Sequence, residues 1–299
     1  MSMRVLLTGA TGYIGGHLLA ACRRHGLEVV ALGRRRPAGW DTAVPFLEAD
    51  LLAAPDVGEL VRRAGASHLL HAAWCTEYGR YWTSPLNARW VDASCRLVEA
   101  FCEAGGRQVV GVGTCAEYDW AQGYCTEGLT PCEPATLYGT AKDAARRLVL
   151  AQCRQHGVTG AWGRLFYPYG PGEPARRLLP ALGRVLRGEQ PVFEVGTTAF
   201  RDFLFAEDMA DAFVALLRSA QGGEYNVCSG EPVRVGVLVE RLAALLGADP
   251  APLLAAHRER AGEPPLLAGD SRRLRSLGWA PRFTLEQGLA RTFVPAPSH

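Results

Sequence analysis

Short apolar runs alternate along the chain with longer stretches in which apolar residues recur every three or four positions. The runs at 5–7, 29–31, 69–71, 109–111 and 160–162 predict buried strands, and the stretches 12–25, 86–104 and 137–156 have the period of amphipathic helices. This alternation is typical of a parallel sheet wound on both faces, because each connection crosses back over the sheet. We therefore predict a doubly wound α/β fold.

The pattern changes after Phe166. Pro168, Pro171, Gly172 and Pro174 interrupt it, and further helices are predicted near 206–219, 234–247 and 284–294. We expect a dinucleotide-binding Rossmann domain over 1–166, with 203–228 returning to its sheet. A smaller C-terminal α/β region for substrate binding is expected over 167–202 and 229–299.

Composition points to small-molecule chemistry. The 299 residues are 48% apolar, and 32 basic and 30 acidic residues give a formal charge of +2 without a block of one sign, so we expect neither nucleic acid nor a membrane as a partner. No apolar run approaches the roughly 18 residues of a membrane span and no leader-like segment precedes the first strand, which favours a cytoplasmic protein. Nine cysteines without paired CxxC spacing predict reduced structural thiols and no metal site.

A glycine triplet lies between the first predicted strand and the first predicted helix. Glycines there permit a tight turn and let backbone amides approach a pyrophosphate at the helix N-terminus. A lone triplet can be only a turn, but the flanking strand and helix indicate a dinucleotide site. We expect cofactor contacts from Gly9, Thr11, Gly12, Tyr13, Ile14 and Gly15.

The end of the second strand bears on the choice of cofactor. A fold that prefers NAD usually carries an acidic residue there, but this chain reads Gly33-Arg34-Arg35-Arg36. A guanidinium suits a 2′-phosphate, although a solvated basic loop is the alternative. We predict NADPH rather than NAD, with Arg34 at the phosphate. Asp50 and Leu51 are expected to contact the cofactor beside the adenine. Ala72, Ala73 and His71 are expected to lie beneath the cofactor. We expect His71 to be a packed side chain and not a catalytic one.

Tyr138 and Lys142 are four residues apart in a predicted helix. Positions i and i+4 share one face, so the lysine ammonium is expected to lower the pKa of the phenol and to reach a nicotinamide ribose. A tyrosine in that setting is a proton donor or acceptor for redox chemistry.

The glycine turn, Tyr138 and Lys142 are part of a larger set of motifs that indicates a family. The other members of the set are Thr114 and Tyr118 in GVGTCAEYDW, the segments 164–166, 169–171 and 201–203, and Asp208. The chain resembles the extended short-chain dehydrogenase/reductase superfamily over about residues 4–293, most closely its nucleotide-sugar branch of epimerases, dehydratases and 4-ketoreductases. The resemblance implies a catalytic triad of Thr114, Tyr138 and Lys142. It also implies a homodimer joined through the helices at 86–104 and 137–156.

Within that branch, the two residues after the triad threonine separate the reactions. The resemblance implies that 4,6-dehydratases carry Asp-Glu there as acid and base, whereas this chain has Cys115 and Ala116, which cannot replace them. Glu117 is expected to point to the other face of an extended segment, in a structural role.

Three functions remain open. A 4-ketoreductase would use NADPH once to reduce a nucleotide-diphosphate 4-keto-6-deoxy sugar, a reading that Arg34 and the string GTCAEYDW favour. A 4-epimerase would keep NAD bound and return the hydride to the sugar. A non-catalytic dinucleotide-binding redox sensor is the alternative from another class, and the complete triad argues against it.

A nucleotide-diphosphate sugar needs cations for its phosphates and polar groups for its hydroxyls. The resemblance places Arg260 at the diphosphate and Asp270 near the nucleotide ribose. Arg201 is a second candidate cation, and Arg176 and Arg177 are a third. Thr76 and Tyr81, in an aromatic loop after the strand at 69–71, are expected at the sugar with Thr114 and Cys115.

Overall fold

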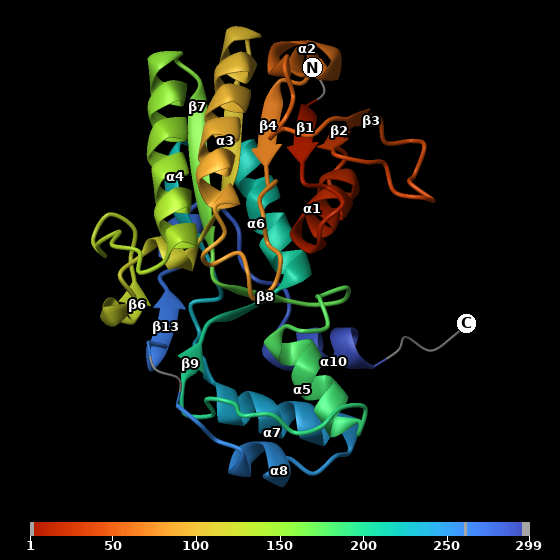
Figure 1. The fold of residues 1–299 in the computed structure, drawn as a ribbon, viewed down its shortest axis with the longest axis vertical. Coiled ribbons are helices and arrows are strands. Elements are labelled where there is room, and N and C mark those ends of the chain that lie inside the picture. The colour runs from red at the N-terminus through yellow and green to blue at the C-terminus, as the bar shows by residue number, and fades with distance from the viewer. Residues whose placement is uncertain (1–2, 260–261, 295–299) are drawn as a thin grey trace.

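The main sheet has seven parallel strands in the order β11-β7-β5-β4-β1-β2-β3, as seen in a computed structural model that describes residues 3–259 and 262–294 (Figure 1). The strand order turns between β1 and β4, and ligands bind beyond the carboxyl ends of the strands at such a point. The strands are β1 Arg4–Thr8, β2 Glu28–Gly33, β3 Phe46–Glu48, β4 His68–His71, β5 Gln108–Thr114, β7 Thr159–Leu165 and β11 Gly223–Val227.

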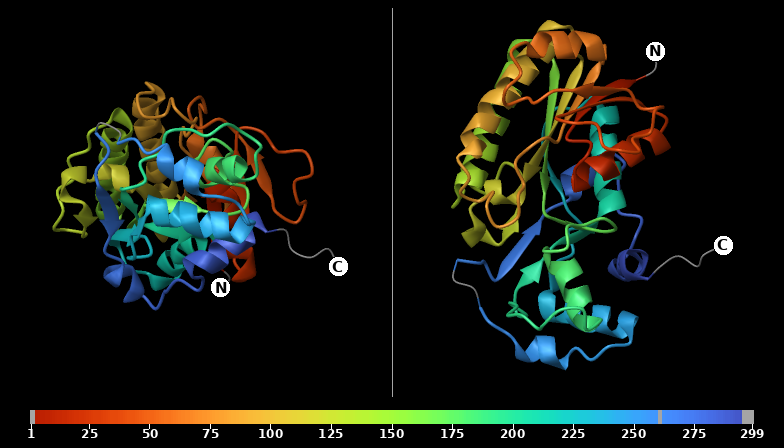
Figure 2. Two further views of the ribbon diagram at one scale, coloured as in Figure 1. Left: turned by 90° about the horizontal axis from the view of Figure 1, so that it is seen from below. Right: turned by 45° about the vertical axis from the view of Figure 1, so that its right-hand side comes forward.

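Helices cover both faces of this sheet, which confirms the doubly wound fold (Figure 2). One face packs against α2, α3 and α4 and the other against α1 and α6, each through its own apolar core. None of these helices, nor any other in the described part of the chain, has the length and apolar character needed to cross a membrane. Their bounds are α1 Tyr13–Arg24, α2 Val57–Ala64, α3 Leu86–Glu103, α4 Leu137–Gln155 and α6 Ala206–Ser219.

A smaller layer lies beyond the carboxyl ends of the strands, as Figure 1 shows in the lower half of the molecule. Its core is formed by Phe203, Leu182, Leu238 and their apolar neighbours. The helices here are α5 Leu178–Leu186, α7 Val235–Leu246, α8 Ala251–Ala255 and α10 Leu285–Phe293, and the short strands are β6 Tyr124–Cys125, β8 Tyr167–Tyr169, β9 Phe200–Arg201, β10 Phe203–Phe205, β12 Val233–Arg234 and β13 Leu266–Gly269. The short helix α9 Arg272–Arg275 instead packs against β11, with Leu274 in the core of the main sheet.

The helices predicted from periodicity agree with the structure to within a residue or two at each end. The chain also returns to the main sheet after α6, because β11 pairs with β7. The domain boundaries proposed from the sequence stay a prediction. The helices α2, α5, α8 and α9 and the short strands of the smaller layer were not foreseen.

Two glycines of the predicted cofactor turn are required by close contacts. Gly9 has φ +75°, and a Cβ added there would lie 2.9 Å from the backbone of Ala72 and Ala73. A Cβ on Gly15 would lie 1.9 Å from the Gly9 carbonyl oxygen. The turn therefore holds the first strand, the start of α1 and the end of β4 in contact.

This packing predicts opposite effects for two neighbouring substitutions on α1. Gly15→Ala should lower the melting temperature by several degrees, because the new methyl must push the turn apart. Gly16→Ala is the matched control: that position is exposed, with no atom within 4 Å of an added Cβ, so alanine should be neutral or stabilise by up to about 1 kcal/mol. Equal melting temperatures for the two variants, measured by circular dichroism, would contradict the packing argument.

Candidate active site

Thr114 and Tyr138 are brought together by a close contact between α4 and the turn after β5. Thr114 ends β5 and caps the short 3₁₀ helix η1 (Cys115–Glu117), and Thr136 caps α4 by accepting a hydrogen bond from the Gly139 amide at 3.1 Å. A Cβ on Gly139 would lie 2.1 Å from the Ala116 carbonyl oxygen. Glycine at this position therefore lets the first turn of α4 rest on η1.

The Tyr138 ring is held between aromatic side chains. Tyr81 and Trp82 meet it edge-on, with centroid distances of 4.9 and 5.6 Å, and the Tyr138 amide donates to the Trp82 carbonyl at 3.1 Å. Burial raises the pKa of Tyr138 above its usual value, and the nearby Thr114 side chain offsets part of that rise. The phenol is consequently a proton donor at neutral pH.

The expectation that Lys142 lowers the pKa of Tyr138 is wrong in this structure. The Lys142 ammonium donates to the Val112 carbonyl at 2.8 Å and lies 3.9 Å from the ring of Trp74, and it is not among the groups that shift the phenol. The helical spacing was correct, but a carbonyl and an aromatic face attract the ammonium. Burial lowers the pKa of Lys142 itself to about 7.

His71 is a packed side chain, as the sequence indicated. Its ring nitrogens make hydrogen bonds with Thr8 Oγ1 at 2.8 Å and Ser94 Oγ at 2.9 Å. Burial, and then the Lys142 charge, lower its pKa to about 3, so the ring is neutral at pH 7. It supports the end of β4, next to Ala72 and Ala73.

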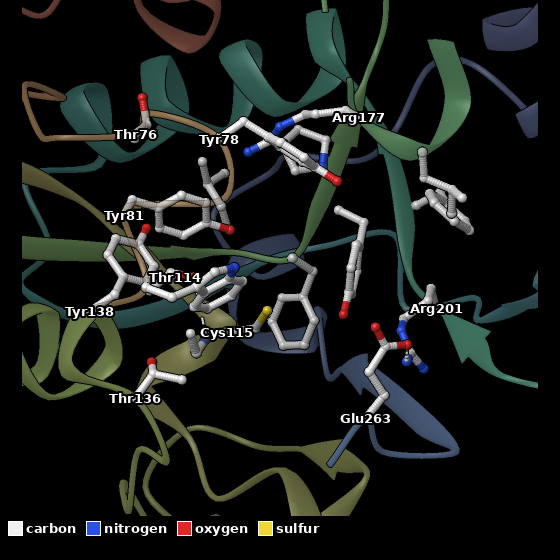
Figure 3. Close-up of a pocket in the computed structure, with 18 of the residues that line it drawn as sticks. Thr76, Tyr78, Tyr81, Thr114, Cys115, Thr136, Tyr138, Arg177, Arg201 and Glu263 are labelled. Carbon is white, nitrogen blue, oxygen red and sulfur yellow. Dashed lines mark hydrogen bonds and ion pairs between the residues drawn. The ribbon is translucent and has the colours of Figure 1, made fainter. Parts of the chain in front are cut away.

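A cavity of about 520 Å³ extends from the cofactor turn to the smaller layer (Figure 3). Ile14 and Ala72 line it near the turn, and aromatic side chains line much of the rest. Every residue of the predicted triad faces this cavity, as do four of the predicted substrate contacts: Thr114, Tyr138 and Lys142, and Thr76, Tyr81, Cys115 and Arg201.

These lining residues fit a dinucleotide. Gly9 turns beneath α1 with no side chain in the way, and Ile14 and Ala72 connect that turn to Tyr138 through one continuous space. A pyrophosphate would meet the free amides at the start of α1, and the nicotinamide end would reach Lys142.

Among the described residues, two arginines line the cavity in addition to Lys142. Arg201 is buried, donates to the Phe200 and Pro264 carbonyls at 2.8 Å and pairs with Glu263 at 3.4 Å. Arg177 lies above Tyr78 in Figure 3. Its neighbour Glu173, which sequence reasoning missed, also lines the cavity; burial raises its pKa to about 7, and Arg177 opposes that rise.

Other predicted contacts among the described residues do not line this cavity. Arg260 falls outside the described residues. Asp270 is not among the residues that line the cavity, and its carboxylate accepts hydrogen bonds from Arg272, the shortest at 2.5 Å. Arg176 is exposed. Asp50 is half-buried, and its carboxylate accepts a hydrogen bond from the Leu52 amide at 3.0 Å. Leu51, the next residue, is buried.

Arg34 lies exposed just beyond β2, as the cofactor prediction requires. Within the described parts of the chain it takes part in no hydrogen bond or ion pair of the structure. Arg36, by contrast, donates to the Phe46 carbonyl at 3.4 Å. Arg34 is therefore available to a ligand at the edge of the cofactor turn.

Neither of the two residues after Thr114 carries a carboxylate. Cys115 and Ala116 both line the cavity, and burial raises the pKa of the Cys115 thiol above its usual value. All nine cysteines are free thiols.

The sequence predicted that Glu117 lies on an extended segment, and this prediction is wrong. Glu117 lies in η1, where its carboxylate turns inward and accepts a hydrogen bond from the Thr114 amide at 2.9 Å. No three His, Cys, Asp or Glu side chains gather as a metal-binding group within 3–259 and 262–294.

Comparison with known proteins adds independent findings. The profile of the NAD dependent epimerase/dehydratase family matches residues 5–228. The chain is 29% identical to a UDP-glucose 4-epimerase of Azospirillum brasilense, over 97% of this chain and 91% of that protein. It is 32% identical to a GDP-6-deoxy-D-mannose reductase of Pseudomonas aeruginosa, over 54% of this chain and 56% of that protein.

A solved structure resembles the whole chain. MoeE5 in complex with UDP-glucuronic acid and NAD superimposes with a TM-score of 0.82 and 30% sequence identity, over 97% of both chains. The similarity therefore includes the smaller layer as well as the main sheet.

The buried Lys142 predicts a pH-dependent stability. Between its folded pKa of about 7 and its usual value of 10.5, the unfolded chain binds more protons, so this side chain makes stability rise with pH. Lys142→Met removes that contribution. The stability of Lys142→Met relative to the wild type should therefore fall from pH 7 to pH 9, by at most about 1.4 kcal/mol per pH unit, in urea unfolding of cofactor-free protein. A difference that does not vary with pH would contradict it.

Proposed function

Because the chain belongs to the NAD dependent epimerase/dehydratase family, we propose that it reduces the C4 ketone of a nucleotide-diphosphate 4-keto-6-deoxy sugar, with NADPH as reductant. The observation that carries this proposal is the reaction centre itself. Tyr138 is a protonated phenol beside Thr114, and the two positions that follow Thr114 hold no ionised group at neutral pH.

Each side chain of the triad has a separate role in the reduction. Tyr138 gives its proton to the ketone oxygen as negative charge develops there, and the Thr114 hydroxyl makes a second hydrogen bond that orients the carbonyl. Lys142 faces the same cavity, where its ammonium would hold the nicotinamide ribose. A bound nicotinamide supplies the hydride. The aromatic wall around Tyr138 limits the access of water to the reacting oxygen.

Arg34 supports NADPH, although MoeE5 was solved with NAD. Its guanidinium is exposed beyond β2, where it can meet a 2′-phosphate. A one-way reduction consumes its reductant, which agrees with a cofactor that is bound from solution and released.

The arginines of the cavity suit a nucleotide diphosphate. Arg201 and Arg177 face the same space as Tyr138, and the β9 edge that carries Arg201 is joined to β13. Their guanidinium groups provide charge for the phosphates. The relatives named above act on UDP-glucose and on a GDP-linked 6-deoxy sugar, which supports a nucleotide-sugar substrate without identifying its base.

A 4-epimerase is the second candidate, and the similarity to a UDP-glucose 4-epimerase over nearly the full length of both chains favours it. Bound NAD would first accept hydride from C4 while the triad takes the C4 hydroxyl proton, and the hydride and the proton would then return to the ketone, the hydride on its other face. This reaction needs no net reductant, so a 2′-phosphate site would have no evident use.

One pair of assays separates the two candidates. Reduction predicts loss of nicotinamide absorbance when NADPH is mixed with a dTDP-, GDP-, CDP- or UDP-linked 4-keto-6-deoxyhexose. Epimerisation predicts interconversion of UDP-glucose and UDP-galactose by protein that carries NAD through purification. The second result without the first would overturn the proposed reduction.

The variant control is Tyr138→Phe, which should lower kcat at least 100-fold while cofactor affinity changes little, because only the proton donor is lost. Tyr124→Phe is the matched control: it removes the hydroxyl of an exposed tyrosine that does not line the cavity, so it should retain most of kcat. Comparable losses in the two variants would contradict the role of Tyr138.

The role of Arg34 has a test of its own. Arg34→Ala should raise the dissociation constant for NADPH about 10-fold or more and leave that for NADH nearly unchanged, because only the 2′-phosphate contact is lost. Arg35→Ala, the adjacent exposed arginine, is the matched control. Equal weakening of NADPH and NADH in Arg34→Ala would mean that this arginine contributes only surface charge.

A further inference from the structure

A group of buried charges lies directly beneath the reaction centre and has no part in the mechanism above. Glu117 and Arg164 both have fully buried side chains, and Arg164 Nε donates to Glu117 Oε2 at 2.8 Å. Trp162 Nε1 donates to the same carboxylate at 3.0 Å. Burying a charge is costly unless it is paired and hydrogen-bonded, and Glu117 is fully satisfied in this way.

One oxygen of Glu117 acts directly on the catalytic turn. Oε1 accepts the Thr114 amide at 2.9 Å, while Thr114 Oγ1 accepts the Ala116 amide at 3.2 Å. A Cβ on Gly113 would lie 2.5 Å from this Oε1, so the strand has a glycine where the carboxylate passes. Glu117 thus fixes the backbone from which the Thr114 hydroxyl reaches Tyr138.

Glu117 also supplies the opposite charge for Lys142. The groups that face the ammonium are the Val112 carbonyl from β5, the rings of Trp74 and Trp162, the neutral His71 from β4 and, as an anion, Glu117 from η1. Its charge favours the protonated lysine against burial, and it disfavours ionisation of Tyr138. Both effects keep protons on the two groups.

We propose that Glu117 is a positioning residue of the reaction centre, which fixes the turn carrying Thr114 and supplies the buried negative charge that balances the Lys142 ammonium. The inference rests on the proposed roles of Thr114, Tyr138 and Lys142. Its first effect is on geometry and its second on protonation, so the two can be measured separately.

The composition of the chain makes the second effect directly measurable. Lys142 is the single lysine among the 299 residues. Protein labelled with ¹³C-lysine therefore gives one side-chain signal, whose change with pH is the titration of Lys142. The measurement uses cofactor-free protein without substrate, so its outcome does not depend on which reaction the enzyme catalyses.

Glu117→Gln should lower the titration midpoint of Lys142 by at least about 0.5 pH unit, because the neutral amide no longer favours the ammonium. Arg164 keeps a partner in this variant, since its Nη2 pairs with Glu224 at 2.6 Å. Glu224→Gln is the matched control: it removes a carboxylate from Arg164 and Arg146, but Glu224 is not among the groups that shift Lys142 or Tyr138. An unchanged midpoint in Glu117→Gln, or an equal fall in Glu224→Gln, overturns the proposal.

Glu117→Asp separates charge from position, and it also serves if Glu117→Gln does not fold. The shorter side chain keeps the negative charge but withdraws from the Thr114 amide. The Lys142 midpoint should stay near that of the wild type, while kcat falls about 10-fold with little change in KM. Wild-type kcat in Glu117→Asp would overturn the positioning role, whatever the titration gives.

Discussion

The close approach of α4 to the turn after β5 is the constraint on which the reaction centre depends. Gly139 permits it, because any side chain would collide with the Ala116 carbonyl. Through this contact the Tyr138 phenol meets the Thr114 hydroxyl, although the two residues belong to different elements. The same contact places Lys142 against β5, where it donates to the Val112 carbonyl. A backbone contact between a strand end and a helix start thus assembles three side chains.

Burial then determines what these groups can do. Tyr138 holds its proton more firmly and Lys142 less firmly than in water, because the low-dielectric surroundings disfavour the charged form of each. The buried carboxylate of Glu117 acts on both groups in the direction that keeps them protonated. A proton-donating tyrosine agrees with reduction of a ketone, in which the newly formed alkoxide must be neutralised. These protonation states agree with the proposed reduction.

Much of the fold and of the site could be read from residue patterns. Contiguous apolar runs identified the long strands, because these strands are buried on both faces, and apolar positions at a period of 3.6 identified the helices. The triad residues followed from helical spacing and family resemblance, and all three line one cavity. Short strands such as β9 and β13 could not be read, because two to four residues carry no period and pair only when distant segments meet. Glu173 was missed for the same reason: it lies in a loop whose local pattern indicates only a turn.

The sequence by itself determined the alternation of strands and helices, the glycine turn and the residue types available for chemistry, because these depend on neighbours along the chain. The tertiary structure decided how charges interact. Helical spacing put Lys142 on the face of Tyr138, but the Val112 carbonyl and the Trp74 ring, both distant in sequence, direct its ammonium. The sequence predicted a structural role for Glu117 on an extended segment. In the structure Glu117 lies in a 3₁₀ turn, and its side chain forms a buried ion pair with Arg164. Electrostatic interactions act through space, so only the folded chain determines their partners.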